Sequence, residues 1–250
     1  GRIRTNLGNI HQPDRGTHQG LHHGTVRLMA EHTVKAFDED ITRLRGLIAE
    51  MGGLAKVAIA ESLDALVRGD EVLADAVVAR DRRIDALETE VDKLAVRIIA
   101  LRAPMADDLR EVIAALKIGG VLERIGDYSK NIAKRTGMIE GRARFEPLTL
   151  LPTMGELAGE MVHDVLTAYA ARDPDLAREV IATDVKVDGF YNSIFRNLVS
   201  YMVENPSTIS SAAQLLFVAR NIERIGDHAT NVAEMVHFAA TGAYPPEGDR

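Results

Sequence analysis

From residue 33 onward, apolar residues recur at intervals of three and four positions along almost the whole chain. This period places them on one face of an α-helix. Breaks at Gly69-Asp70, Ala103-Pro104 and Asp173-Pro174 divide the pattern, and Asp followed by Pro is a typical helix N-cap. The pattern predicts six long helices, over approximately residues 33–68, 71–101, 107–136, 150–171, 174–202 and 209–240.

The second half of the chain repeats the first half. The pentapeptide ERIGD occurs at Glu123–Asp127 and again at Glu223–Asp227, and 223 − 123 = 100. Residues 68–85 align with residues 172–188 at an offset of 184 − 81 = 103. A period of this length is too long for a solenoid repeat. The expected fold class is therefore all-α, with six long helices in two pseudo-symmetric three-helix bundles formed by a duplicated unit.

The predicted domains follow from this repeat. Residues 29–140 are expected to form the first bundle, residues 141–242 the second, and residues 243–250 a C-terminal tail. Residues 1–28 are rich in Gly, His, Arg and Asn and lack helical periodicity, so we interpret them as a disordered or non-native extension before a start at Met29. A metal-binding arm is the alternative, because four of the eight His residues lie there.

Composition narrows the choice of function. Hydrophobic residues make up 46% of the chain, aromatic residues only 4%, and Trp is absent, which suits a helical bundle. The net charge of −7 argues against a nucleic-acid partner, which needs a basic face. The absence of Cys excludes disulfides and thiolate metal ligands and fits a reducing compartment. No apolar run is long enough to span a membrane, and helices this acidic predict membrane association only through partners.

Paired carboxylates continue the apolar seams of the third and sixth helices. Stacked acids repel one another, and near a core they need a neutralising cation or proton. Carboxylate and amide oxygens suit hard metal ions. Acids on the second and fifth helices are spaced to face them. The predicted metal ligands are Asp81, Asp85, Glu123, Asp127 and Asn131 in the first copy and Asp184, Asp188, Glu223, Asp227 and Asn231 in the second.

An ion-pair network is the alternative interpretation of these acids. Lys130 lies three residues after Asp127, and Arg220 lies three residues before Glu223. Each motif also contains an arginine, and more basic residues lie on the facing helices. Gly126 inside the first motif, and Gly119-Gly120 a turn or two earlier, remove side-chain bulk and predict the close approach of another group.

The duplicated motif resembles the PhoU family of phosphate-specific transport accessory proteins. The stretch "KLAVRIIALRAPMADDLREVIAALKIGGVLERIGDYSKNIAK" is similar to the first motif block of that family, and "FVARNIERIGDHATNVAE" is similar to the second. The similarity covers roughly residues 31–240. It implies a fold of two three-helix bundles, with multinuclear metal clusters on the E/D-x-x-x-D motifs. The implied metal is a divalent or trivalent ion, such as Fe, Zn, Mn or Mg.

The resemblance also implies a function. Members of the family are non-enzymatic, cytoplasmic regulators of phosphate homeostasis. They are adaptors that link the ATPase of the phosphate ABC transporter to the sensor kinase of the phosphate two-component system. They repress the phosphate-starvation response and restrain uptake when phosphate is plentiful. A homodimer is expected. Tyr191 stands where the first copy has an acid, Glu88, so the two sites are expected to be non-equivalent.

The competing hypothesis is a di-iron carboxylate oxidoreductase on a helical bundle. Such enzymes use two E-x-x-H motifs with a Glu from each of two other helices. The chain contains this motif at Glu160–His163 and at Glu234–His237. The first of these has no counterpart in the other copy. The Gly-rich sequence of a phosphate-binding loop is absent, so no dedicated phosphate or nucleotide pocket is expected.

Overall fold

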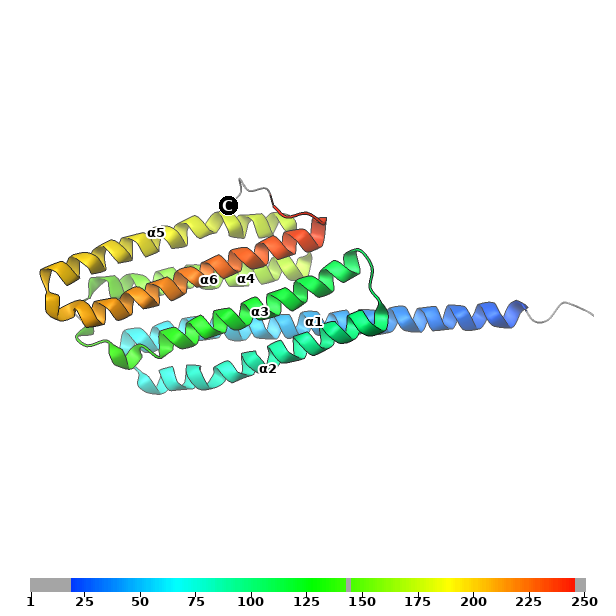
Figure 1. Cartoon of the computed structure of the whole chain (residues 1–250), viewed down its shortest axis with the longest axis horizontal. Helices are drawn as coiled ribbons and strands as arrows, with labels where there is room; N and C mark the ends of the chain where they lie inside the picture. The colour runs from blue at the N-terminus through cyan, green and yellow to red at the C-terminus, as the bar shows by residue number, and fades with distance from the viewer. Residues whose placement is uncertain (1–18, 143–144, 246–250) are drawn as a thin grey trace, which may run out of the picture. The chain divides into compact units, whose positions relative to one another are not determined.

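The computed structural model describes residues 19–142 and 145–245, and the long elements in these ranges are α-helices (Figure 1). Short 3₁₀ helices cover Thr136–Met138, Glu146–Thr149 and Pro206–Thr208 in the connections. The α-helices are α1 (Gln19–Arg68), α2 (Glu71–Arg102), α3 (Asp107–Ala133), α4 (Leu150–Ala171), α5 (Pro174–Glu204) and α6 (Ile209–Thr241).

Most helix boundaries agree with the hydrophobic pattern. The Asp70 carboxylate accepts a hydrogen bond from Leu73 N–H at 2.9 Å, as a helix N-cap should. Two differences appear. Helix α3 ends at Ala133, short of the predicted residue 136. Helix α1 begins at Gln19 rather than at residue 33. Of the predicted N-terminal extension 1–28, residues 1–18 lie outside the described residues.

The chain divides into two compact units, residues 1–39 and residues 40–250. In the first unit, the described residues 19–39 belong to α1. The second unit contains the remainder of α1 and helices α2 to α6. It therefore includes both copies of the repeat, and the predicted boundary between the bundles near residue 140 stays a prediction.

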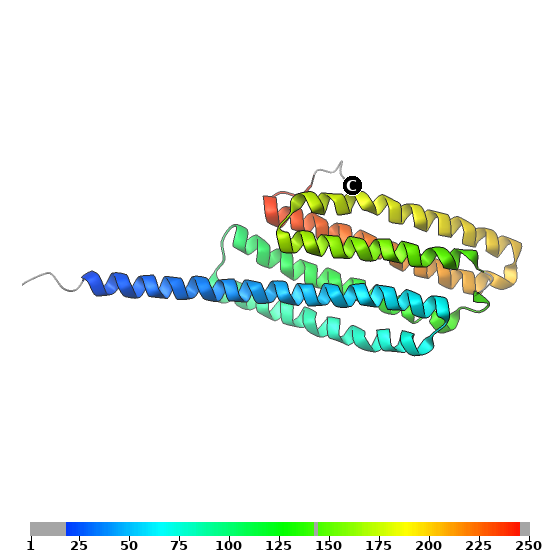
Figure 2. The ribbon, with the colours of Figure 1, turned by 180° about the vertical axis from the view of Figure 1, so that it is seen from behind.

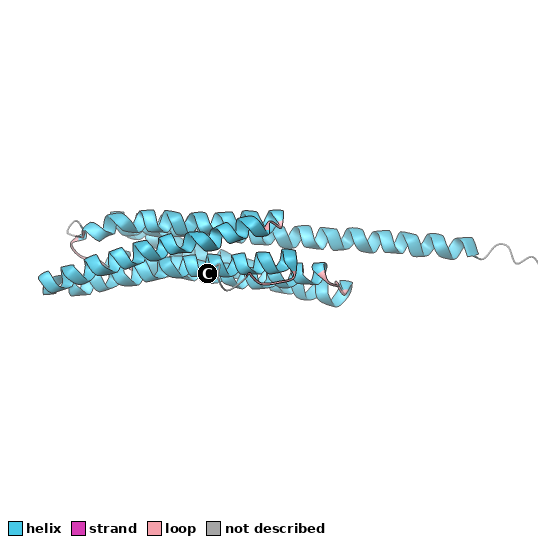
Figure 3. Cartoon of the chain, turned by 90° about the horizontal axis from the view of Figure 1, so that it is seen from above, coloured by secondary structure: helices cyan, strands magenta, loops and turns pink. Residues whose placement is uncertain are grey.

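Within residues 40–245, four helices lie side by side in the order α2, α3, α6, α5 (Figure 1). Helix α4 packs on α5 and α6. The α1 segment from residue 40 packs on α2 and α3, and both α1 and α4 come to the front in the reverse view (Figure 2). Seen from above, the helices within residues 40–245 form two layers (Figure 3). The core includes the fully buried side chains of Ile48 on α1, Leu87 on α2 and Leu122 on α3.

The two copies meet through equivalent contacts in the back layer. A Cβ at Gly52 of α1 would lie 1.9 Å from Leu166 Cδ1 of α4, and a Cβ at Gly155 of α4 would lie 2.0 Å from Leu63 Cδ1 of α1. These two contacts are copies of each other, because 155 − 52 = 103 and 166 − 63 = 103. The offset of 103 therefore extends into the first helix of each copy, as a pseudo-two-fold arrangement requires.

Candidate functional site

Each ERIGD motif lies against an aspartate of the neighbouring helix. A Cβ at Gly126 would lie 3.1 Å from Asp81 Oδ1 of α2, and a Cβ at Gly226 would lie 2.9 Å from Asp184 Oδ1 of α5. Only glycine leaves room for an oxygen at this distance. The predicted close approach is confirmed: at Gly126 both the Ile84 side chain and the Asp81 carboxylate of α2 come close, and at Gly226 the nearest group is the Asp184 carboxylate of α5.

These contacts define two acidic seams. The first acidic seam consists of Asp81, Asp85, Glu88 and Asp92 on α2 and of Glu123, Asp127 and Asn131 on α3. The second acidic seam consists of Asp184 and Asp188 on α5 and of Glu223, Asp227 and Asn231 on α6. The structure thus brings the predicted ligands of each copy onto two facing helices.

The first acidic seam is neutralised at one end by Lys130. Its Nζ donates hydrogen bonds to Asp81 of α2 and, at 2.5 Å, to Asp127 of its own helix. Asp81 is only 6% exposed, so this ion pair is largely shielded from water. Burial lowers the pKa of Lys130, but the hydrogen bonds to Asp127 and Asp81 outweigh it and raise that pKa well above its usual value.

The other end of the first acidic seam carries less positive charge. Arg124 lies 3.6 Å from Glu123 and 3.8 Å from Asp127 and is largely exposed. Burial raises the pKa of Glu123 and of Glu88, and the neighbouring carboxylates raise them further. Burial and Asp81 likewise raise the pKa of Asp85.

The second acidic seam has no counterpart of Lys130. The equivalent position is Thr230, because 230 − 130 = 100. Among the described residues, no basic side chain forms an ion pair with Asp184, Asp188 or Asp227. Burial raises the pKa of Asp184 to about 6, with further contributions from Asp188 and Asp227, while a hydrogen bond with Thr230 acts in the opposite direction.

The basic residue of the second acidic seam lies at the opposite end. Arg220 pairs with Glu223, and its guanidinium carbon lies 5.7 Å from the centre of the Tyr191 ring. Glu223 is 8% exposed, and its Oε2 has no hydrogen-bond partner. Burial, together with Asp227, raises the pKa of Glu223 to about 7, although Arg220 acts against this rise.

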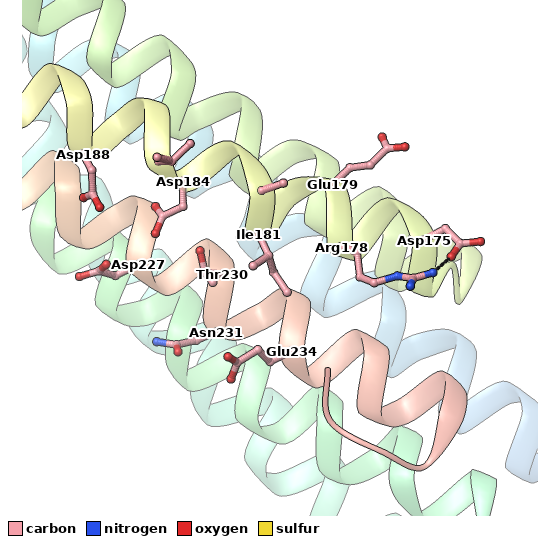
Figure 4. Close-up of a pocket in the computed structure, with 12 residues that line it drawn as sticks. Asp175, Arg178, Glu179, Ile181, Asp184, Asp188, Asp227, Thr230, Asn231 and Glu234 are labelled. Atoms are coloured by element: carbon pink, nitrogen blue, oxygen red, sulfur yellow. Dashed lines mark hydrogen bonds and ion pairs between the residues drawn. The ribbon is translucent and has the colours of Figure 1, made fainter. Parts of the chain in front are cut away.

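An open groove of about 1260 Å³ runs between α5 and α6 along the second acidic seam. Asp184 and Asp188 project from α5 toward α6, and the Thr230 side chain lies opposite Asp184 (Figure 4). The one basic residue in the lining, Arg178, pairs with Asp175. The groove is lined by Asp175, Arg178, Glu179, Ile181, Ala182, Asp184, Val185, Asp188, Asp227, Thr230, Asn231 and Glu234.

The two motifs meet where α3 packs against α6. The Tyr128 and His228 rings stack with centroids 5.4 Å apart, and Tyr128 Oη lies 3.2 Å from His228 Nε2. These residues are equivalent, since each directly follows the ERIGD of its copy. Arg224 stacks over Tyr128, with its guanidinium carbon 5.8 Å from the ring centre, whereas its equivalent Arg124 turns toward the acids of its own motif.

A PhoU domain model matches the chain twice, over residues 48–136 and 151–236. The chain belongs to the PhoU family. It is 56% identical over 219 residues to the phosphate-specific transport system accessory protein PhoU homolog of Zymomonas mobilis, covering 88% of this chain and 92% of that protein. It is 47% identical to the homolog of Caulobacter vibrioides, over 86% of this chain and 94% of that protein.

Solved PhoU structures share the fold. PhoU from Pseudomonas aeruginosa superposes with a TM-score of 0.79 at 36% identity, over 83% of this chain and 100% of that one. The phosphate transport system regulatory protein PhoU from Streptococcus pneumoniae also gives 0.79, at 25% identity over 84% and 99% of the two chains. The predicted all-α fold and the resemblance to the PhoU family are therefore confirmed.

The predicted metal ligands can be compared with this geometry. Among the described residues, no three His, Asp or Glu side chains lie close enough together to hold one metal ion. In the first acidic seam, the Lys130 ammonium stands between Asp81 and Asp127. The second acidic seam offers only oxygen donors, one of them the unpartnered Glu223 Oε2, and such a set suits a hard cation chemically. The metal assignment of the ten residues stays a prediction.

The two E-x-x-H segments of the competing di-iron hypothesis lie on different surfaces. Glu160 lines a groove between α1 and α4, whereas Glu234 lines the groove between α5 and α6. His237 Nδ1 lies 2.9 Å from the carbonyl oxygen of Ala243, and His163 is exposed. The described residues thus do not assemble these motifs into one site.

From the sequence, Lys130 was considered as an ion-pair residue, but its replacement by Thr230 in the second copy was missed. That difference was visible at the offset of 100 that relates the motifs. The Tyr128–His228 contact was also missed, although both residues occupy the same place after ERIGD.

No helix of the described chain has the length and apolar character needed to cross a membrane.

Proposed function

We propose that this chain is a non-enzymatic accessory protein of the phosphate transport system that regulates phosphate homeostasis. The observation that carries the proposal is the match of both repeats to the PhoU domain, supported by relatives that cover most of the chain. Those relatives are named as accessory proteins of the phosphate-specific transport system. The matched residues 48–136 and 151–236 include both acidic seams.

We further propose that the chain is a cytoplasmic, homodimeric adaptor protein. It would contact the ATPase of the phosphate transporter and the phosphate-sensing histidine kinase. It would hold the kinase in its inhibitory mode when phosphate is plentiful. The long exposed faces of α2 and α5 offer surfaces for such contacts, and this role does not depend on a bound metal.

Deletion of the gene in the source organism tests the regulatory role. Alkaline phosphatase, a product of the phosphate-starvation response, should be derepressed at high phosphate, and the intact gene supplied in trans should restore repression. Unchanged alkaline phosphatase in the deletion strain would contradict the proposal.

The adaptor role needs a separate test. The purified chain should co-purify with the transporter ATPase and with the cytoplasmic part of the kinase, each expressed alone. Sedimentation of the purified chain should give the mass of a dimer. Retention of neither partner would refute the adaptor while leaving the coarser accessory role to the deletion experiment.

A further inference from the structure

A second groove, of about 360 Å³, lies between α1 and α4, the two helices at the front of the reverse view (Figure 2). We call it the α1–α4 groove. Its floor is apolar, because the buried side chains of Ile59 and Leu63 line it together with Val67 and Pro152. No residue of either acidic seam lines it, so it is a separate feature of the molecule.

Two glycines of α4 line the groove, and only one of them is explained by packing within the chain. A Cβ at Gly155 would lie 2.0 Å from Leu63 Cδ1, whereas a Cβ at Gly159 would have no atom within 4 Å. A glycine inside a helix is less favourable than alanine, and no contact of the described chain requires one at residue 159. The equivalent residue of the first copy is Lys56, since 159 − 103 = 56. Gly159 therefore leaves space open above an apolar surface.

Charged side chains border the α1–α4 groove. Glu156 and Glu160 are exposed, lie one turn apart on α4, and form no ion pair among the described residues. On α1, Asp64 pairs with Arg68 at 2.7 Å, and Lys56 is exposed. The α4 side of the rim thus carries two carboxylates whose charge the described chain does not neutralise.

We propose that the α1–α4 groove binds an amphipathic helix of a partner protein, whose large apolar side chains fill the space over Gly159. Basic residues beside that apolar face lie against Glu156 and Glu160, because unpaired carboxylates at a rim select a positively charged partner. The lined stretch of α1 runs from Lys56 to Val67, which is 67 − 56 = 11 residue steps, or about 16 Å and three helical turns. This length suits an amphipathic helix laid in a groove between two helices.

The inference goes beyond the proposed function, because it assigns a partner of defined chemistry to a face away from the acidic seams. A second copy of this chain is the competing occupant of the groove.

Fluorescence anisotropy of a labelled peptide tests the inference on the full-length chain. The probe is a synthetic amphipathic helix of about four turns, with leucine along one face and lysine on both sides of that face. Gly159→Leu fills the groove and should weaken binding by about tenfold or more. The variant should fold, because a Cβ at Gly159 meets no atom and leucine favours a helix more than glycine does.

Gly46→Leu is the matched control for this substitution. Gly46 is also exposed within a helix, its Cβ would also have no atom within 4 Å, and it does not line the groove. The Gly46→Leu protein should bind the peptide within about twofold of wild type. Equal binding by wild type and Gly159→Leu would overturn the inference, as would no binding to wild type at peptide concentrations up to about 100 μM.

The charged rim gives an independent readout at physiological salt, which screens nonspecific attraction. Glu160→Gln should weaken binding of the lysine-flanked peptide by about threefold, whereas Glu204→Gln, at an exposed position outside the groove, should leave it unchanged. A peptide with glutamate in place of lysine should bind Glu160→Gln more tightly than wild type. Equal weakening by Glu160→Gln and Glu204→Gln would overturn the inference, because it would show attraction to net charge alone.

Sedimentation of the same variants examines the competing occupant. Gly159→Leu should leave the mass of the purified chain unchanged. A shift from dimer to monomer would assign the groove to a second copy of this chain and overturn the inference. None of these outcomes bears on alkaline phosphatase in the deletion strain, so the inference and the proposed function fail separately.

Discussion

The first and second acidic seams share one backbone arrangement and differ in the source of their counter-charge. In both, a helix glycine lets an aspartate of the facing helix come close, at Gly126 for Asp81 and at Gly226 for Asp184. In the first seam Lys130 lies between the helices and binds two carboxylates. In the second seam Thr230 takes its place, and the basic residue, Arg220, lies at the other end with Glu223.

This difference shows how the two copies of a duplicated site can diverge in the way their negative charge is neutralised. The lysine-bridged acids of the first seam join α2 to α3, so they contribute to folding. The acids of the second seam repel one another, and the raised pKa values of Asp184 and Glu223 record the free energy that ionisation of these two groups costs in the folded state. A site that destabilises the free protein can recover that energy when a cation binds.

The largest predicted effect concerns the residue that distinguishes the seams. Lys130→Ala removes the ammonium and leaves the nearly buried Asp81 without its partner, so the free energy of unfolding should fall by about 2–3 kcal/mol. Thr230→Ala should cost less than about 1 kcal/mol, because it removes only hydroxyl hydrogen bonds. Urea denaturation followed by circular dichroism measures both.

Lys134→Ala is the matched control for this comparison. Lys134 lies one turn further along, is exposed, and forms no ion pair among the described residues. Its removal should change stability by less than about 0.5 kcal/mol. Similar losses in Lys130→Ala and Lys134→Ala would show that the bridge in the first seam is not formed in solution.

The pH dependence of stability tests the protonation of Glu223 in the second acidic seam. The folded-state pKa of Glu223, about 7, lies above the usual value for an exposed glutamate. The folded protein therefore holds this proton where the unfolded chain has released it, and stability is lost as the pH rises through about 7. Glu223→Gln should abolish this part of the loss, which is about 1–2 kcal/mol between pH 5 and pH 8.

Denaturation midpoints of both proteins across this pH range provide the measurement. Glu204→Gln serves as control, because Glu204 is exposed at the end of α5 and its removal should leave the profile unchanged. Parallel pH profiles of wild type and Glu223→Gln would mean that Glu223 titrates as an ordinary glutamate.

The helix caps provide the smallest contrast between the copies. Asp173 accepts hydrogen bonds from the N–H groups of Asp175 and Leu176, whereas its equivalent Asp70 accepts one, from Leu73. Each cap should contribute about 1 kcal/mol, with Asp173→Ala costing somewhat more than Asp70→Ala. Asn also caps helices, so Asp173→Asn should retain most of the stability in thermal denaturation. Equal loss in the Ala and Asn variants would show that the cap bond is not what stabilises α5.

The fold could be predicted from the sequence because its signals are local. Helix α4 covers the predicted residues 150–171, and the Asp173-Pro174 pair starts α5 where a capping residue should. The repeat could be recognised from the constant offsets of 100 and 103 between matching residues alone. Helix α1 was predicted less well, because the Gly- and His-rich residues from 19 onward show no helical periodicity, although α1 begins there.

The charge pattern of the site could be predicted only in part. The spacing of the acids placed them on facing helices, but a long basic side chain can reach its own helix or a neighbour, and spacing does not decide between these. Lys130 reaches across to α2, while Arg224 turns to Tyr128 on α3 rather than to the acid three residues away. Such choices depend on the packing of α3 against α6, which the sequence pattern does not contain.

The most direct test of the division between the seams is one substitution made in both copies. Asp81→Asn and Asp184→Asn each remove one negative charge from equivalent positions, and their free energies of unfolding are compared with wild type at about pH 8. We predict opposite signs: Asp81→Asn destabilises by about 1–2 kcal/mol because Lys130 loses a partner, and Asp184→Asn stabilises by about 0.5–1 kcal/mol because repulsion is relieved. Changes of the same sign and similar size would contradict the account, because they would show that both seams are neutralised in the same way.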